Sequence, residues 1–116
     1  SVELVENELM ENAARIGDHM KARMLTWVSR FPIVGDVRGL GLMLGAEIVR
    51  NQQTKERAPD LRDRIETLAF ERGLLVLGCG PNSLRLCPPL VISRDQADFA
   101  LDTLEECLGI LSREIH

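Results

Sequence analysis

The residue of this sequence with the clearest chemical potential is Arg85, in the run SLRLCPPL. On a strand, the flanking Leu84 and Leu86 would face a core, so the arginine would point to the opposite face. Pro88 and Pro89 follow closely and would keep the exit from the strand extended and stiff. A planar guanidinium at a rigid strand end suits bidentate capture of a carboxylate or phosphate. The sequence therefore predicts an anion-binding arginine, with a structural ion pair inside the same domain as the alternative.

Two other charged residues lie in a glycine-rich run upstream. Arg38, in DVRGLG, is beside Gly39, where a turn is expected. Pairing of Arg38 with Asp36 is favoured over contact with a partner surface. Glu47, in LGAEIV, is expected to be an ion-pair partner and not an acid or base catalyst. Both residues are therefore predicted to be structural.

In GDVRGLGLMLG, Gly39, Gly41 and Gly45 have the spacing GxGxxxG, and Gly35 precedes them. A dinucleotide-binding fingerprint needs a strand, then the glycines, then a helix whose N-terminus faces the pyrophosphate. Here the residues that follow, AEIV, continue as a strand. The sequence therefore favours a bend or a close backbone approach at these glycines over a nucleotide site.

Residues suited to covalent or metal chemistry are few. Cys79, Cys87 and Cys107 form no CxxC pair, and two histidines are too few to complete a zinc site. Cys79 lies in a glycine turn with no nearby histidine to lower its pKa. Lys21 and Lys55, the two lysines, lie in polar surroundings unsuited to Schiff-base chemistry. The sequence therefore predicts no catalytic, cofactor-binding or metal-ligating residue in this chain.

Composition indicates the class of protein. A length of 116 residues with 45% hydrophobic and 28% charged residues is typical of one soluble globular domain. A net charge of −4 and only 3% aromatic residues argue against nucleic acid as a partner. No apolar run approaches the roughly 20 residues of a membrane span, so no membrane partner is expected. Unpaired thiols fit a cytoplasmic protein. A helical pattern that begins directly at Ser1 leads us to expect a domain cut from a longer protein.

Three helices are expected to position these residues. Apolar residues recur at spacings of three and four over residues 1–30, up to a Phe-Pro pair that should end the helix. A second helix is expected over 59–72, with Gly73 in the left-handed position that follows it. The last helix begins with a capping box formed by Ser93 and Gln96.

Four short strands complete the predicted fold. They are expected at residues 33–37, 40–49, 74–77 and 83–87, with turns at Arg38-Gly39 and at 78–82. Pairs of strands joined by short loops favour an antiparallel sheet. The sequence therefore predicts an α+β fold, with an antiparallel sheet of about four short strands and three helices packed on one face, and residues 1–116 as a single domain.

The assembled runs resemble a known family. ENAARIGDHMKARM, GDVRGLGLMLGAEIV and ERGLLVLGCGPNSLRLCPPLVISRDQADFALDTLEECL are similar, in this order, to the C-terminal segment of class-III (subgroup II) pyridoxal-phosphate-dependent aminotransferases. The most specific motifs are VRGLGLMLGAE at 37–47 and LRLCPPLVI at 84–92. Within the family, GLGLMLGAEI looks most like 4-aminobutyrate aminotransferases. The resemblance implies a fold-type I enzyme in which this chain forms most of the small domain.

The resemblance also implies an activity, a cofactor and partners. Such enzymes are homodimers that move an amino group from an amino acid, of the 4-aminobutyrate or ornithine type for example, to a 2-oxo acid. Arg85 matches the family's arginine that contacts a substrate carboxylate. Cys87 departs from the small residue expected at its position but is compact and uncharged. The lysine and aspartate that hold pyridoxal 5'-phosphate belong to the large domain and match no position here, so the chain alone is expected to be inactive.

A different class of function fits the same residues. A free-standing α+β module that binds a small carboxylate, such as an amino-acid-sensing regulatory domain, also packs helices on an antiparallel sheet. Arg85 would serve such a module equally well. The sequence upstream of Ser1 separates the two hypotheses, because a stretch of roughly 300 residues would make one long enzyme chain with this one.

Overall fold

The computed structural model describes residues 2–40, 43–74, 76–80, 82–86 and 93–115. The elements are α1 (Val2–Leu25), α2 (Trp27–Arg30), β1 (Val34–Leu40), β2 (Met43–Asn51), β3 (Glu56–Arg57), α3 (Pro59–Glu71), β4 (Leu77–Cys79), β5 (Ser83–Leu86) and α4 (Arg94–Ile115). The sheet has the order β1-β2-β5-β4, every pair in it is antiparallel, and β3 pairs with β2. The predicted α+β fold is therefore confirmed for the described residues.

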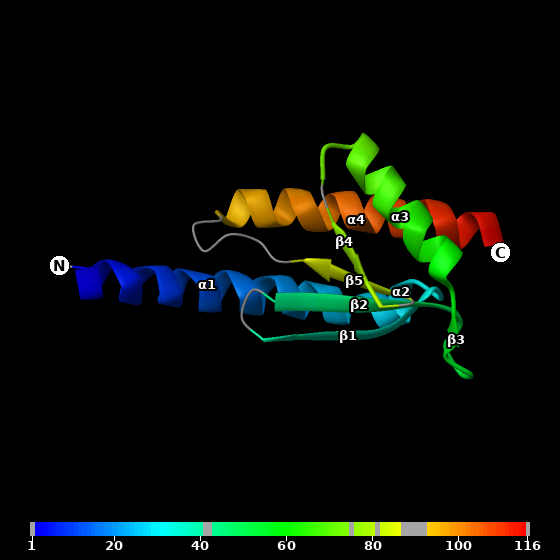
Figure 1. Cartoon of the computed structure of the whole chain (residues 1–116), viewed down its shortest axis with the longest axis horizontal. Helices are drawn as coiled ribbons and strands as arrows, with labels where there is room; N and C mark the ends of the chain where they lie inside the picture. The colour runs from blue at the N-terminus through cyan, green and yellow to red at the C-terminus, as the bar shows by residue number, and fades with distance from the viewer. Residues whose placement is uncertain (1, 41–42, 75, 81, 87–92, 116) are drawn as a thin grey trace.

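Helices cover one face of this sheet and leave the other open. Along β2, Leu44, Ala46 and Ile48 are buried, whereas Gly45 and Glu47 between them are only half-buried. Side chains of α1, α3 and α4 join the β2 residues in one core. Figure 1 shows α1 and α4 running along the molecule, α3 crossing α4, and the N-terminal part of α1 extending beyond the sheet. The strands therefore present one buried side and one side that no described helix covers.

The first helix has the predicted extent but is interrupted at Thr26. Its hydroxyl donates to the Arg23 carbonyl at 2.7 Å, and α2 begins at the next residue. A hydroxyl that bonds the preceding turn competes with the helical ladder, which accounts for the break. Phe31 is extended and ends α2, as the Phe-Pro pair predicts.

The predicted turn at Arg38-Gly39 is wrong. β1 continues through both residues to Leu40, which pairs with Met43, so only two residues connect the strands. The antiparallel ladder continues here because a two-residue connection is enough to join two such strands. The Arg38 side chain is therefore fixed by a strand and not by a turn.

The strand predicted at 74–77 lies later, at Leu77–Cys79. Leu74 donates its N–H to the Ala69 carbonyl at 2.9 Å and so closes the turn that follows α3. Gly73 has the predicted left-handed conformation, with φ of 85°. The turn predicted at 78–82 is shortened accordingly, because β4 includes residues 78 and 79.

The other predicted helix ends are confirmed. Pro59 occupies the first turn of α3. Ser93 and Gln96 form the reciprocal capping box, at 3.0 Å from the Ser93 N–H to the Gln96 side chain and 3.1 Å from the Gln96 N–H to the Ser93 hydroxyl. The strand predicted at 83–87 is observed as β5, and Cys87 lies outside the described residues.

A cluster of charged side chains joins α1 and α2 to α4. The Glu105 carboxylate, 14% exposed, accepts hydrogen bonds from Arg23 and Trp27, each at 2.9 Å, and from Arg30 at 3.2 Å. Burial alone would raise the pKa of Glu105, but these hydrogen bonds outweigh it and hold the pKa below its ordinary value. Glu105 therefore stabilises the helical layer as an ionised carboxylate.

Candidate substrate-binding face

The strand register gathers charged residues on the open face. Asp36 of β1 lies opposite Glu47 of β2, and Arg38 lies opposite Gly45. Gly45 in turn lies opposite Arg85 of β5. Because residues directly opposite on paired strands share a face, the two arginines flank Gly45 across three strands. We call this surface, formed by Asp36, Arg38, Gly45, Glu47 and Arg85, the open face.

Arg38 is paired with acidic groups of the same face. Its Nε donates to Asp36 Oδ2 at 2.9 Å, and its Nη2 donates to Glu47 Oε1 at 2.8 Å. The side chain is 71% exposed, so these are surface ion pairs of modest energy. The predicted pairing of Arg38 with Asp36 and the predicted ion-pair role of Glu47 are both confirmed. The charge of Arg38 is thus engaged within the protein.

Arg85 differs from Arg38 because its side chain has no partner among the described residues. Leu84 and Leu86 are buried on either side of it, and the arginine itself is exposed, as the alternating pattern predicts. Within the described part of the chain, the side chain of Arg85 forms no hydrogen bond or ion pair. The alternative of a structural ion pair has no partner among those residues. Opposite it, Gly45 contributes no side chain that would cover the guanidinium.

The backbone beneath Arg85 is held on both sides. β5 lies between β2 and β4, with Arg85 paired to Gly45 on one side and to Leu77 on the other. Just before β5, the buried Asn82 donates its side-chain amide to the Ile48 carbonyl at 2.9 Å, and Ile48 donates its N–H to the Asn82 carbonyl at 2.9 Å. A side chain on such a strand has a fixed origin and direction.

Neither lysine is suited to hold pyridoxal 5'-phosphate. Lys21 Nζ donates to the Gly39 carbonyl at 2.9 Å, and Lys55 Nζ donates to the Gly35 carbonyl. Both ammonium groups therefore bind the backbone of β1 instead of lying free in an apolar cavity, where a lysine pKa falls. The residues of this chain do not fit the covalent site of that cofactor.

The described residues also offer no reactive thiol or metal site. Cys107 is buried in α4, and burial raises the pKa of its thiol, which disfavours the nucleophilic thiolate. The side chain of Cys79 and all of Cys87 lie outside the described residues. No group of three His, Cys, Asp or Glu side chains with metal-binding geometry occurs in the described part of the chain.

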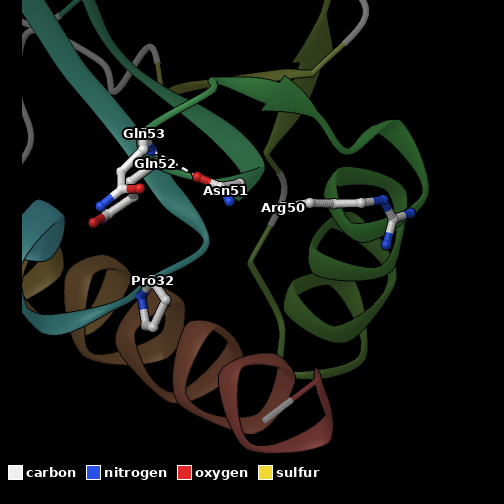
Figure 2. A pocket seen from close by; sticks show the side chains of 5 residues that line it. All are labelled: Pro32, Arg50, Asn51, Gln52 and Gln53. Atoms are coloured by element: carbon white, nitrogen blue, oxygen red, sulfur yellow. Dashed lines mark hydrogen bonds between the residues drawn. The ribbon is translucent and has the colours of Figure 1, made fainter.

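A pocket of about 340 Å³ lies away from the open face, between the start of β1 and the end of β2 (Figure 2). It is lined by Pro32, Arg50, Asn51, Gln52 and Gln53. The Gln52 amide donates to three main-chain carbonyls, at 2.6 to 3.2 Å, and ties the end of β2 to α2 and β1. Arg50 points toward α3 in Figure 2 and pairs with Asp60. These polar groups are therefore engaged in holding the fold.

Comparison with known proteins identifies the family. Residues 2–108 match the class-III aminotransferase family. This chain belongs to that family. The leucine/methionine racemase of Thermococcus litoralis is 37% identical over 107 residues, which are 92% of this chain and 24% of the racemase. The 4-aminobutyrate aminotransferase of Mycobacterium leprae is 35% identical over 112 residues, which are 94% of this chain and 25% of that enzyme.

Solved structures of a transaminase and an aminotransferase have the same fold. A transaminase with L-ala superposes with a TM-score of 0.89 at 30% identity, over 97% of this chain and 27% of the other. A Bacillus anthracis aminotransferase superposes with a TM-score of 0.86 at 34% identity, over 93% of this chain and 26% of the other. The chain therefore spans about a quarter of the length of the relatives it matches.

Among the described residues, none of the helices combines the length and the apolar character that a membrane span requires.

Proposed function

We propose that this chain is the C-terminal small domain of a pyridoxal-phosphate-dependent class-III enzyme that moves an amino group from an amino acid to a 2-oxo acid. In this proposal Arg85 binds a substrate carboxylate. The observation that carries it is the contrast on the open face. Arg38 has two acidic partners, whereas Arg85, on a strand held from both sides, has none among the described residues. The family match over residues 2–108 favours an enzyme segment over a free-standing carboxylate-binding module.

The proposed contribution of this chain is binding and orientation. The Arg85 guanidinium can donate two parallel hydrogen bonds to a carboxylate, which fixes both the position and the plane of that group. The Arg85 side chain is exposed, and Gly45 on the neighbouring strand has no side chain, so there is room for a ligand beside the guanidinium on the open face. Pyridoxal 5'-phosphate, which stabilises negative charge on the reacting carbon when bound, would be held by a large domain outside these residues, in a homodimer.

Amino-acid racemisation is the second candidate. Proteins named leucine/methionine racemase, alanine/serine racemase and isoleucine 2-epimerase are 37%, 37% and 38% identical to this chain. A carboxylate-binding arginine serves racemisation and amino transfer equally. Incubation of the full-length protein with one enantiomer of an amino acid, with and without a 2-oxo acid, separates the two reactions. Amino transfer requires the 2-oxo acid, whereas chiral chromatography would detect racemisation without it.

Arg85→Lys tests the site in the full-length enzyme. Lysine keeps the charge but loses the two-pronged fork. Loss of one charge-assisted, partly desolvated pair typically costs about 2–5 kcal/mol, so kcat/KM for carboxylate-bearing substrates should fall well over tenfold. Each half-reaction is followed separately through the cofactor spectrum, and the half-reaction that uses glutamate or 2-oxoglutarate should lose most. Near-normal rates in both, with several degrees lost in Tm, would make Arg85 a structural residue.

The chain without its large domain should be inactive. Both lysines bind main-chain carbonyls, so neither is available to capture pyridoxal 5'-phosphate. After incubation with the cofactor and reduction with borohydride, mass spectrometry should find no added mass at Lys21 or Lys55. The full-length enzyme serves as the positive control. A stoichiometric adduct on either lysine would contradict the proposed division between the domains.

A further inference from the structure

The guanidinium of Arg62 fastens the β4–β5 connection to α3. Its Nη1 donates to the Gly80 carbonyl and to the Ser83 carbonyl, each at 3.1 Å. Ser83 begins β5, two residues before Arg85. The Arg62 side chain is only 13% exposed, and its Nε donates to Asp63 Oδ1 at 2.9 Å. Charge-assisted hydrogen bonds to both ends of one short connection hold it more firmly than neutral ones would.

Gly78 of β4 provides the space that this arginine occupies. A Cβ at that position would lie 3.0 Å from Arg62 Cζ and 2.1 Å from Glu66 Oε1. Glu66 itself lies 3.5 Å from Arg62 Nε and, with Asp63, keeps the guanidinium oriented. The absence of a side chain at residue 78 therefore allows α3 to reach the main chain of the β4–β5 connection.

We infer that Arg62 is a positioning residue for Arg85. The inference rests on the proposed function, in which Arg85 binds a carboxylate. The side chain of Arg85 forms no hydrogen bond or ion pair with the described residues. The position of its guanidinium therefore depends on the backbone of β5. That backbone is fixed at its start by Asn82 from the β2 side and by Arg62 from the α3 side. A displacement of about 1 Å in such a group is enough to cost a large factor in substrate affinity or rate.

The test measures inhibition of the full-length enzyme by glutarate, a dicarboxylate without an amino or oxo group. Arg62→Lys keeps the charge but has a single nitrogen, so it cannot donate to the two carbonyls while a second nitrogen pairs with Asp63 and Glu66. We expect it to raise the glutarate inhibition constant about tenfold, and Arg85→Lys to raise it about thirtyfold or more. Arg64→Lys is the matched control, because Arg64 is on the same helix but pairs with Glu114 of α4. It should leave the constant unchanged.

The double variant distinguishes positioning from general stability. If Arg62 acts through Arg85, adding Arg62→Lys to Arg85→Lys should change the inhibition constant by less than about twofold. Independent, multiplying effects would overturn the inference, and so would a normal constant for Arg62→Lys alone. In both cases the proposed function would stand. A normal constant for Arg85→Lys would overturn the proposed function and the inference with it.

Gly78→Ala provides a second route if Arg62→Lys does not fold. The added methyl group would lie 2.1 Å from Glu66 Oε1 and 3.0 Å from Arg62 Cζ, so Glu66 must move away from the guanidinium that it orients and Arg62 must shift slightly. We therefore expect a selective loss of glutarate binding that is smaller than for Arg62→Lys. Combined with Arg85→Lys, it should add nothing further. A Gly78→Ala enzyme that binds glutarate like the wild type would overturn the inference.

Discussion

Glu105, between the helices, accepts hydrogen bonds from three side chains, whereas Arg85, on the open face, has no partner among the described residues. Both are charged groups on regular elements. The first lies where its ionised form joins α1 and α2 to α4. The second lies where its charge pairs with none of the described residues. Under the proposed function, the contrast separates a charge that stabilises the helical layer, at Glu105, from a charge that is available to a ligand, at Arg85.

The largest effect should come from the core beneath the helices. Leu101 is fully buried in α4, and Leu101→Ala would remove the Cγ and both Cδ atoms and leave a cavity. We expect a loss of about 2–5 kcal/mol in the free energy of unfolding, measured in urea. Leu25→Ala, at a position 52% exposed, is the control and should change stability by less than about 0.5 kcal/mol. Equal losses at the two positions would contradict this packing.

Glu105→Gln should have the next largest effect. The amide keeps the shape of the side chain but loses the charge that binds Arg23 and Arg30, so we expect a loss of about 1.5–3 kcal/mol. Glu106→Gln is the matched control on the same helix. Glu106 is 60% exposed and makes one ion pair with Arg72, so its substitution should cost less than about 1 kcal/mol.

The same carboxylate gives the helical layer a defined acid sensitivity. The pKa of Glu105 is lowered in the folded state, so its contribution is present above the unfolded-state pKa, about 4.3. That contribution is lost as the pH falls through the lower folded-state value. Between pH 6 and pH 3, the free energy of unfolding should fall more steeply for the wild type than for Glu105→Gln. Urea unfolding at each pH measures this. Parallel curves would mean that the carboxylate is not engaged as described.

The sequence predicts elements better than it predicts contacts between them. Local periodicity and capping residues were enough for the helices, because apolar spacing and the Ser93–Gln96 pair act within one or two turns. Glycine located the end of α3 at Gly73 but misplaced the turn between β1 and β2. The Arg38-Gly39 pair continues a strand because the ladder to β2 outweighs the local turn preference. The Glu105 cluster could not be predicted, since its partners are 75 to 82 residues apart in sequence.

The open face shows the same division. Alternation around Arg85 predicts its exposed side, and short-range charge patterning predicts the Arg38–Asp36 pair. The role of Arg62 has no local signal, because its partners are main-chain carbonyls 18 and 21 residues away. Only the packing of α3 beside the β4–β5 connection brings them together.

The smallest effects on stability should come from the two arginines of the open face, with Arg85 below Arg38. Arg38→Ala breaks two exposed ion pairs and should cost less than about 1 kcal/mol. Arg85→Ala breaks none among the described residues and should change the free energy of unfolding by less than about 0.5 kcal/mol. Urea unfolding at low and at high salt separates them, because screening weakens only the interactions that the wild type makes through Arg38. A loss at Arg85 larger than at Arg38 would show that Arg85 serves the fold, which would contradict its proposed role in binding a ligand.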